Sequence, residues 1–250
     1  MKKFLVVLLL LALLSAGVYW KFFRISQAEP VPVAVTIESL SSDAGLVTEK
    51  SSTPEIIPPE ELNLAMTFYS QAPFADWSMP WQEACEEASV LLIANAYFQH
   101  NWSKEEFRDQ ILSLVDWENK AFGDYKHTDA SQTSQILKDY LILDNRIIEN
   151  PTFDDIRESI ARGHLLVGLF AGKKIGNPYY KNGGPNYHAM VIKGYKNGFK
   201  VITEDVGTRK GEDYVYSWPT LNAALHDYAE PIEKGRPILI EVIPPSANDK

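Results

Sequence analysis

The sequence predicts an α+β domain in which an N-terminal helical half packs on an antiparallel β-sheet. Helical patterns come first, between residues 83 and 163, and short apolar or alternating runs typical of strands follow from residue 164. Helices that precede strands in this way are typical of an α+β arrangement. A hydrophobic content of 45%, with twelve tyrosines, eleven phenylalanines and six tryptophans, suffices for one large or two small cores.

An apolar run precedes this domain. Residues 4–20 carry no charge and would form a helix of roughly 25 Å, slightly short of a bilayer core. A cleaved signal peptide needs small residues before the cleavage site, and residues 15–17 (SAG) match this requirement only in part. The run continues to Trp20, however, and aromatic residues suit the membrane interface. We therefore expect residues 1–24 to be a transmembrane anchor that places the domain outside the cell membrane, with a signal peptide and secretion as the alternative.

The next stretch differs in composition from both of its flanks. Residues 25–62 contain five prolines, many serines, threonines and glutamates, and no aromatic residue, which is typical of a disordered tether. Residues 35–40 have the composition of a short strand, but no neighbouring pattern would cover it. We expect a disordered linker over residues 25–63 and a folded domain over residues 64–245.

Each element of the domain has its own signal. Ser103 and Glu106 form a capping-box pattern at the start of one helix, and Thr152 begins another helix that Gly163 ends. The expected helices are residues 83–98, 103–117, 131–141 (starting at Ser131 or Thr133), 152–163 and 220–228. The expected strands are residues 66–69, 164–170, 188–192, 199–202 and 237–242.

The charge of the chain excludes some partners. The formal net charge is −9 although the first 24 residues carry only basic charges, so the remainder is more acidic still. Such a domain repels phosphate backbones, which argues against a nucleic-acid partner. A single cysteine excludes an internal disulfide.

That cysteine, Cys85, is the first candidate for chemistry. A lone cysteine in a helix is most often a small buried hydrophobe. Cys85, however, follows a loop with proline and tryptophan (residues 71–81) and begins the first long helix, where free N–H groups and the helix dipole favour a thiolate. Glu86 and Glu87 work against a thiolate, but acidic residues are also preferred in a first helical turn. Their presence does not exclude a reactive Cys85.

A thiolate nucleophile needs a base, and the base needs an orienting group. Among five histidines, His188 opens an apolar strand directly after a loop rich in Gly, Pro, Asn and Tyr, residues 173–187. Asp205 follows another strand, where the chain turns. Two adjacent antiparallel strands, one beginning at His188 and one ending near Asp205, would bring both side chains to the same sheet edge. The ordinary alternatives are a structural strand histidine and a turn aspartate.

An acyl-transfer site also needs hydrogen-bond donors for an oxyanion. The backbone N–H of Cys85 can supply one donor, and a side-chain amide from Gln82 or Gln71 can supply the other. Gln82 is preferred because it lies close to Cys85 in the sequence, and Gln71 is the alternative.

Three segments together resemble a known family: residues 69–98 (YSQAPFADWSMPWQEACEEASVLLIANAYF), 183–195 (GGPNYHAMVIKGY) and 201–218 (VITEDVGTRKGEDYVYSW). They are similar to the papain-like cysteine peptidases of the bacteriocin-processing type, the double-glycine leader peptidases, and to their stand-alone bacterial relatives.

The resemblance implies a papain-like cysteine peptidase fold and hydrolysis of peptide bonds through a thioester, with no metal or organic cofactor. Carried over by position, Cys85 would be the nucleophile, His188 the base and Asp205 the orienting residue, with Gln82 as the nearby glutamine. One feature departs from the exporter peptidases, which have a glutamine close before a Cys-Gly pair, because Cys85 is followed by two glutamates.

Three functions are compatible with this pattern. The preferred one is a membrane-tethered extracytoplasmic cysteine peptidase that acts on peptides or proteins, because the three candidate residues follow an export segment. A non-catalytic peptide-binding module on the same fold, or a cell-wall amidase or transpeptidase, are the alternatives, since a fold does not dictate a function. Trp77, Trp81 and the loop 173–187 are candidates to shape a groove, although packing is the commoner role of tryptophans.

Overall fold

The computed structural model of the chain describes residues 29–43 and 57–246. The expected transmembrane anchor, residues 1–24, lies outside these ranges. Within them, no helix is both long and apolar enough to cross a bilayer.

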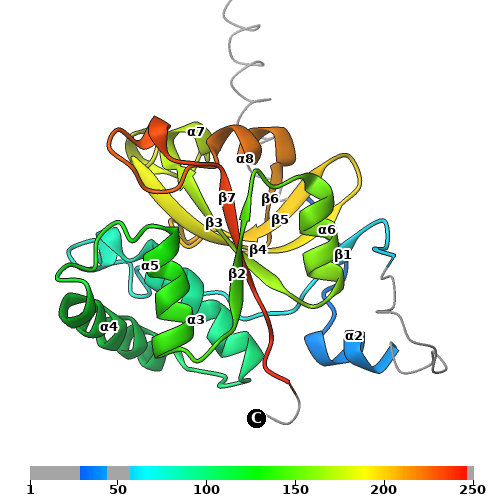
Figure 1. Cartoon of the computed structure of the whole chain (residues 1–250), viewed down its shortest axis with the longest axis horizontal. Coiled ribbons are helices and arrows are strands. Elements are labelled where there is room, and N and C mark those ends of the chain that lie inside the picture. The colour runs from blue at the N-terminus through cyan, green and yellow to red at the C-terminus, as the bar shows by residue number, and fades with distance from the viewer. Residues whose placement is uncertain (1–28, 44–56, 247–250) are drawn as a thin grey trace, which may run out of the picture. The chain divides into compact units, whose positions relative to one another are not determined.

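One antiparallel sheet organises the described part of the chain (Figure 1). Its strands run in the order β2–β7–β3–β4–β5–β6, and β1 pairs with β4 outside this path. The apolar runs expected as strands form its centre, because β3 and β4 are buried along almost their whole length. The strands are β1 Leu62–Asn63, β2 Asn145–Glu149, β3 Leu165–Ala171, β4 Tyr187–Lys196, β5 Lys200–Glu204, β6 Tyr214–Ser217 and β7 Ile238–Val242.

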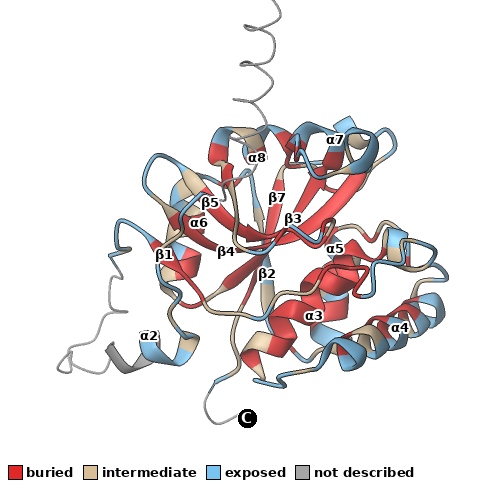
Figure 2. Ribbon diagram, turned by 180° about the vertical axis from the view of Figure 1, so that it is seen from behind, coloured by how far each residue is buried: buried red, intermediate tan, exposed pale blue. Residues whose placement is uncertain are grey.

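Helices pack around this sheet and confirm the mixed architecture of helices and antiparallel strands. Helix α3 lies between β4 and α4, which is why nearly every residue of α3 is buried (Figure 2). Its start therefore faces the strand that carries His188. The helices are α2 Ile37–Asp43, α3 Cys85–Tyr97, α4 Lys104–Ala121, α5 Ala130–Gln135, α6 Phe153–Ala161, α7 Gly172–Ile175 and α8 Trp218–Ala224, and a π-helical turn follows α5 at Ile136–Tyr140.

The helix starts follow from capping chemistry. The predicted capping box of α4 is present, with the Ser103 hydroxyl accepting from the Glu106 N–H and the Ser103 N–H donating to the Glu106 carboxylate. Thr152 caps α6 as predicted. Helix α5 begins earlier than expected, because Asp129 is its N-cap and forms a capping box with Gln132. In these three helices a side chain that accepts from the first turn thus marks the start.

Other local expectations differ from the structure. In the described segment around residues 66–69 no strand forms, because Leu62–Asn63 already occupies the edge of β4 and the chain then leaves the sheet. Strands β2 and β6 were not expected. They lie at the two ends of the strand order and are only partly buried, so their apolar pattern is weak.

Residues 31–43 pack on the domain, which differs from the disordered linker expected over residues 25–63. The Val35 N–H donates to the Asn63 carbonyl at 2.9 Å, so this segment continues the hydrogen bonding of the sheet edge. Ile37 packs against the core and lies 3.2 Å from the place where a Cβ on residue 163 would stand. The stretch 35–40 is therefore not a strand: Val35 makes one isolated bridge with Leu64, and Ile37 begins α2.

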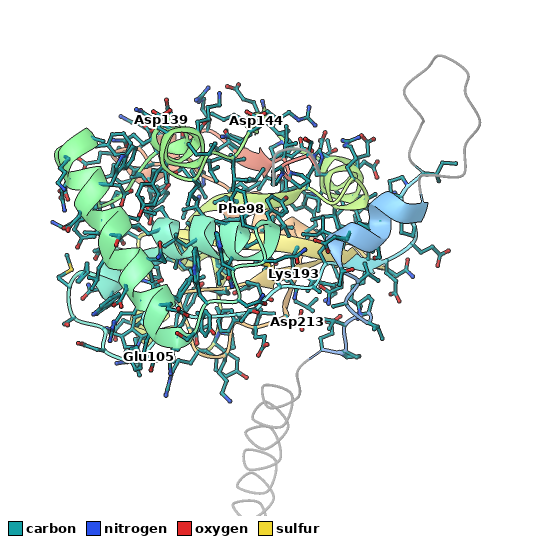
Figure 3. The ribbon with its side chains drawn as sticks, turned by 90° about the horizontal axis from the view of Figure 1, so that it is seen from below. Phe98, Glu105, Asp139, Asp144, Lys193 and Asp213 are labelled. Atoms are coloured by element: carbon teal, nitrogen blue, oxygen red, sulfur yellow. The ribbon has the colours of Figure 1, made fainter. Side chains whose placement is uncertain are left out.

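A cluster of charged side chains links the end of β5 to β4. Lys193 of β4 is 2% exposed, and its Nζ lies 2.8 Å from Glu204 and 2.7 Å from Asp213 (Figure 3). Burial raises the pKa of Glu204 to about 7, although Lys193 opposes this shift. Glu204 therefore points to a different partner than Asp205, its neighbour in sequence, as alternation along a strand requires.

A second buried carboxylate, Glu241 on β7, predicts how stability depends on pH. It accepts hydrogen bonds from His164 Nδ1 at 2.7 Å and from Arg146 Nε. Burial alone would raise its pKa, but these two partners lower the pKa of Glu241 from 4.5 to about 2. Since the folded-state pKa is depressed, the stabilisation is present above the unfolded-state value and is lost as the pH falls from about 4.5 towards 2.

Glu241→Gln should therefore lower the free energy of unfolding at neutral pH by roughly 2 kcal/mol, a value discounted because Arg146 is exposed to solvent. Urea unfolding of the full chain in detergent at neutral and acidic pH measures this loss. The variant should also lose part of the acid dependence of the wild type. Glu158→Gln, which removes an exposed pair with Arg162, serves as the control. An equal loss in both variants would contradict the assignment.

Candidate active site

Cys85 stands at the first position of α3, as predicted. The N-cap residue, Ala84, provides no side-chain cap, so the N–H groups of the first turn lack the usual capping acceptor. The side chain is 6% exposed, which leaves only a small opening to solvent. Its Sγ donates a hydrogen bond to Glu86 Oε2 at 2.8 Å. In this structure the sulfur is thus a thiol directed at a carboxylate.

The surroundings of Cys85 disfavour a thiolate. Burial raises the pKa of the Cys85 thiol well above its ordinary value, and the charge and hydrogen bond of Glu86 raise it further. The backbone N–H of Ala189, the residue after His188 on β4, opposes this shift. That contact also places the sulfur beside the start of β4. The helix dipole alone therefore does not produce the thiolate that the sequence pattern suggested.

His188 and Asp205 are brought together by the pairing of β4 and β5. Val191 pairs with Glu204 in the antiparallel register, so the start of β4 lies opposite the residues that follow β5. His188 Nε2 and Asp205 Oδ1 are 2.9 Å apart, and both side chains are almost fully buried. The predicted meeting of an imidazole and a carboxylate at one sheet edge is present in the structure.

Asp205 is held by several donors besides His188. Its Oδ2 accepts from Asn177 Nδ2 at 2.9 Å, from the Tyr180 hydroxyl at 2.7 Å and from the Tyr216 hydroxyl at 2.5 Å. Burial alone would raise the pKa of Asp205, but His188 and these hydroxyl groups lower it below its ordinary value. The carboxylate is therefore ionised and fixed, which is what the orientation of an imidazole requires.

The second nitrogen of His188 is open. Nδ1 is buried and has no hydrogen-bond partner within the described part of the chain. Tyr180 packs edge-on against the ring, with centroids 5.5 Å apart and planes at 77°. On another side lies Gly207, where an added Cβ would stand 2.7 Å from His188 Cε1. The ring is thus fixed by its neighbours while Nδ1 stays available for a reacting group.

The two candidate glutamines have different environments. Gln82 is exposed, and its Nε2 lies 3.4 Å from Glu83 Oε1. Gln71 is 3% exposed, and its Nε2 donates to the carbonyls of Trp81 and Gln82 at 2.9 and 3.1 Å. Its backbone N–H also donates to Val206, directly after Asp205. Burial and location favour Gln71 over Gln82 as the amide associated with the site.

Three buried carboxyl groups extend from Cys85 into the helical half. Burial raises the pKa of Glu86 to about 7 and that of Glu118 on α4 to about 8. Burial and the charge of Glu118 raise the pKa of Glu87 well above its ordinary value. Glu87 and Glu118 therefore hold protons at neutral pH and Glu86 is only partly ionised there, so the acidic pair after Cys85 does not act as two full negative charges. Within the described residues, no group of three or more potential ligands is arranged to hold a metal ion.

A hollow lies on the loop that leads to Cys85. It has a volume of about 270 Å³ and is lined by Pro73, Phe74, Asp76, Trp81 and Arg108. Of the two tryptophans that were candidates to shape a groove, Trp81 lines this hollow.

The sequence pattern identified the histidine and carboxylate pair but not the residues that support it. Asn177 and Tyr180 belong to the loop that was expected to shape a groove, and instead they hold Asp205. Tyr216 lies on the unexpected strand β6. In the described structure the Cys85 thiol is hydrogen-bonded to Glu86 and His188 Nδ1 has no hydrogen-bond partner. The two proposed reaction partners are therefore not joined by a hydrogen bond.

Comparison with known proteins identifies the family of the chain and a solved structure with a similar fold. The profile of the Peptidase_C39 like family matches residues 63–230, which include Cys85, His188 and Asp205. A crystal structure of a protein from Bacillus anthracis, described provisionally as a C39-like peptidase, is similar with a TM-score of 0.50 and 15% sequence identity. The similarity covers 75% of this chain and 100% of that chain, and at this identity it concerns the fold alone. No curated protein matches the chain.

Proposed function

The chain belongs to the Peptidase_C39 like family, and we propose that it is a cysteine peptidase that hydrolyses peptide bonds through Cys85, His188 and Asp205. The observation that carries the proposal is the buried hydrogen-bonded pair of His188 and Asp205, in which His188 Nδ1 has no partner within the described residues. This pair lies at the start of β4, where the Ala189 N–H also contacts the Cys85 sulfur. An imidazole oriented by a carboxylate and open on its second nitrogen is the base that a thiol nucleophile needs.

The reaction that we propose uses His188 Nδ1 as base and then as acid. Nδ1 takes the proton of Cys85 as Sγ bonds to the substrate carbonyl carbon, and the carbonyl oxygen becomes an oxyanion. Nδ1 then protonates the leaving amine, the C–N bond breaks and a thioester remains. Water attacks the thioester, its proton passes through Nδ1 to the sulfur, and a carboxylic acid is released.

Asp205 supports each step without reacting. Its bond to Nε2 keeps the other ring nitrogen directed at the nucleophile, and its negative charge stabilises the imidazolium that forms. The oxyanion would be bound by the backbone N–H of Cys85 at the start of α3. Gln71 is the preferred side-chain contributor because it is buried beside the loop and the end of β5, although one of its N–H groups must first leave the carbonyl of Trp81 or Gln82. Gln82 is the second candidate.

Residues 4–20 motivate the further proposal that the peptidase is tethered to the cell membrane and faces outward, with secretion as the outcome if the segment is cleaved. Its substrates would then be extracytoplasmic peptides or proteins. Fractionation of cells that express the full chain, with and without residues 1–24, tests this. Recovery of the full chain in the soluble cytoplasmic fraction would contradict it.

A peptide-binding module without turnover is the second candidate, because the thiol is 6% exposed and bonded to Glu86 instead of His188. The full chain in detergent should be incubated with a peptide library, with denatured protein and with peptidoglycan fragments, and the products identified by mass. Cleaved peptides that disappear with Cys85→Ala support the proposal. Binding that survives Cys85→Ala, with no cleavage by the wild type, selects the module, and products only from peptidoglycan select an amidase or transpeptidase.

Gly207 provides a separate test of the site. Gly207→Ala places a Cβ 2.7 Å from His188 Cε1 and 3.1 Å from Nε2, so the ring must shift from its bond with Asp205. We expect kcat/KM for peptide cleavage to fall about tenfold to a hundredfold, because small misplacements of a catalytic group are costly. Initial rates of peptide cleavage measure this.

The control for this substitution is Gly123→Asn. Residue 123 has φ +88 and no heavy atom within 4 Å of an added Cβ, and asparagine tolerates such a backbone better than most residues. Activity should be unchanged. An unaffected rate in Gly207→Ala, with the variant folded, would show that the ring position does not matter for the reaction.

A further inference from the structure

The contact between Cys85 and Glu86 is not needed for the proposed reaction, and it competes with it. A thiol that donates to Glu86 Oε2 at 2.8 Å does not use its proton to bond His188 Nδ1. At the same time Nδ1 is buried and unpartnered in the described structure, although it is the nitrogen that the nucleophile must meet. In the structure the Cys85 thiol is therefore hydrogen-bonded to a group other than the base, and the base, His188, has no hydrogen-bond partner on Nδ1.

We infer that Glu86 is a positioning residue that holds Cys85 as a resting thiol away from His188, and that protonation of Glu86 releases the sulfur to the imidazole. The inference rests on the proposed function, since it concerns the charge state of the same nucleophile. It assigns a role to a residue at which this chain departs from the Cys-Gly pair of the exporter peptidases.

The geometry explains why the two charge states of Glu86 act in opposite directions. An ionised carboxylate only accepts hydrogen bonds, so it holds the protonated sulfur and repels a thiolate. A protonated carboxyl group has an O–H that can donate to a thiolate, and it no longer carries the repelling charge. The same side chain therefore restrains the nucleophile when charged and supports it when neutral.

The charge of Glu86 depends on groups from every element packed around it. Burial raises the pKa of Glu86 most, and the hydrogen bond from Cys85 opposes this shift. The charge of Glu83, in the turn before α3, raises the pKa further, and the backbone N–H of Thr128 in the loop before α5 lowers it. Glu87 and Glu118, on α3 and α4, interact with Glu86 as further buried acids.

On the sheet side, Tyr187 of β4 faces both Glu86 and Cys85, and the pKa of its phenol is raised well above its ordinary value by burial and by Glu86. His127 adjoins Thr128, and its Nδ1 lies 3.8 Å from Glu83. With these neighbours the pKa of Glu86 is about 7, so its charge changes across the neutral range. The pKa is raised, so Glu86 is neutral below that pH and charged above it.

The experiment measures the rate at which iodoacetamide alkylates Cys85 in the full chain in detergent, at about pH 5.5 and about pH 8.5, on either side of the Glu86 transition. The chain has one cysteine, so the label reports this sulfur alone. Wild type is compared with Glu86→Gln, whose neutral amide imitates the protonated carboxyl group. Glu105→Gln is the control, because it removes an exposed acid in the first turn of α4 that contacts neither the thiol nor the buried acids.

At about pH 5.5 wild type and Glu86→Gln should react at similar rates, and at about pH 8.5 the variant should react about tenfold faster or more, since each unit of thiol pKa changes the thiolate fraction about tenfold. The control should follow wild type at both values. A ratio of Glu86→Gln to wild type that does not change with pH overturns the inference.

If Glu86→Gln does not fold, Glu86→Asp replaces it, because the shorter side chain keeps the charge and withdraws it from the sulfur. Faster alkylation than wild type at the higher pH then supports the inference, and an unchanged rate overturns it. Failure of the proposed function is distinguishable, because it appears as an absence of peptide cleavage in every variant, whatever the ratio of alkylation rates.

Discussion

His188→Ala is expected to lower kcat/KM for peptide cleavage by about 10³- to 10⁴-fold, and Cys85→Ala by about as much. The two residues act as one unit, since the sulfur reacts only after its proton has moved to Nδ1. The double variant should therefore be no slower than either single variant. This lack of additivity is the sharper part of the prediction, because independent contributions would multiply.

The measurement is the initial rate of cleavage of one peptide by the full chain in detergent, over a range of enzyme concentrations that resolves weak residual activity. Both side chains are buried, so thermal unfolding of each variant must be compared with wild type. His100→Ala, at an exposed histidine stacked on Trp102, is the control and should retain full activity. Losses that multiply in the double variant would mean that the residues do not share one step.

Much of the fold could be predicted because its signals are local. The capping side chains of Ser103 and Thr152 identified two helix starts, and the buried strands β3 and β4 are apolar along their length. The strands β2 and β6, at the two ends of the strand order, are only partly buried, so their sequences lack the apolar pattern that would predict a strand. The docking of residues 31–43 uses backbone hydrogen bonds of Val35 with Asn63 and Ala65 and a contact of Ile37 at the Gly163 turn, which are distant in the sequence, so no local pattern carries that information.

The site was predictable where strand geometry determines it. His188 begins one strand and Asp205 follows its neighbour, so antiparallel pairing brings them together. The direction of the Cys85 thiol was not predictable, because it depends on the rotamers of two adjacent helical side chains. For the same reason Glu86 was interpreted only as a charge near the sulfur, whereas the structure places its carboxylate in contact with it.

Asp205→Asn is expected to cause the second large loss, about 10²- to 10⁴-fold in kcat/KM. The carboxylate accepts at Oδ1 from the His188 ring, which fixes the proton on Nε2 and leaves Nδ1 as the base. An amide nitrogen at that position would donate instead and favour the other tautomer, with the proton on Nδ1. The base would then be blocked although the shape of the site is nearly unchanged.

The supporting donors allow a matched comparison. Tyr216→Phe removes one hydroxyl group that donates to Oδ2 and leaves the Oδ1–His188 bond in place, so it should cost less than about tenfold. Because the pKa of Asp205 is held below its ordinary value, the carboxylate is ionised over the whole neutral range. The loss in Asp205→Asn should therefore be the same at each pH from mildly acidic to mildly alkaline. A loss that vanished at one end of this range, in a folded variant, would mean that Asp205 acts by titrating and not by holding the imidazole in one tautomer.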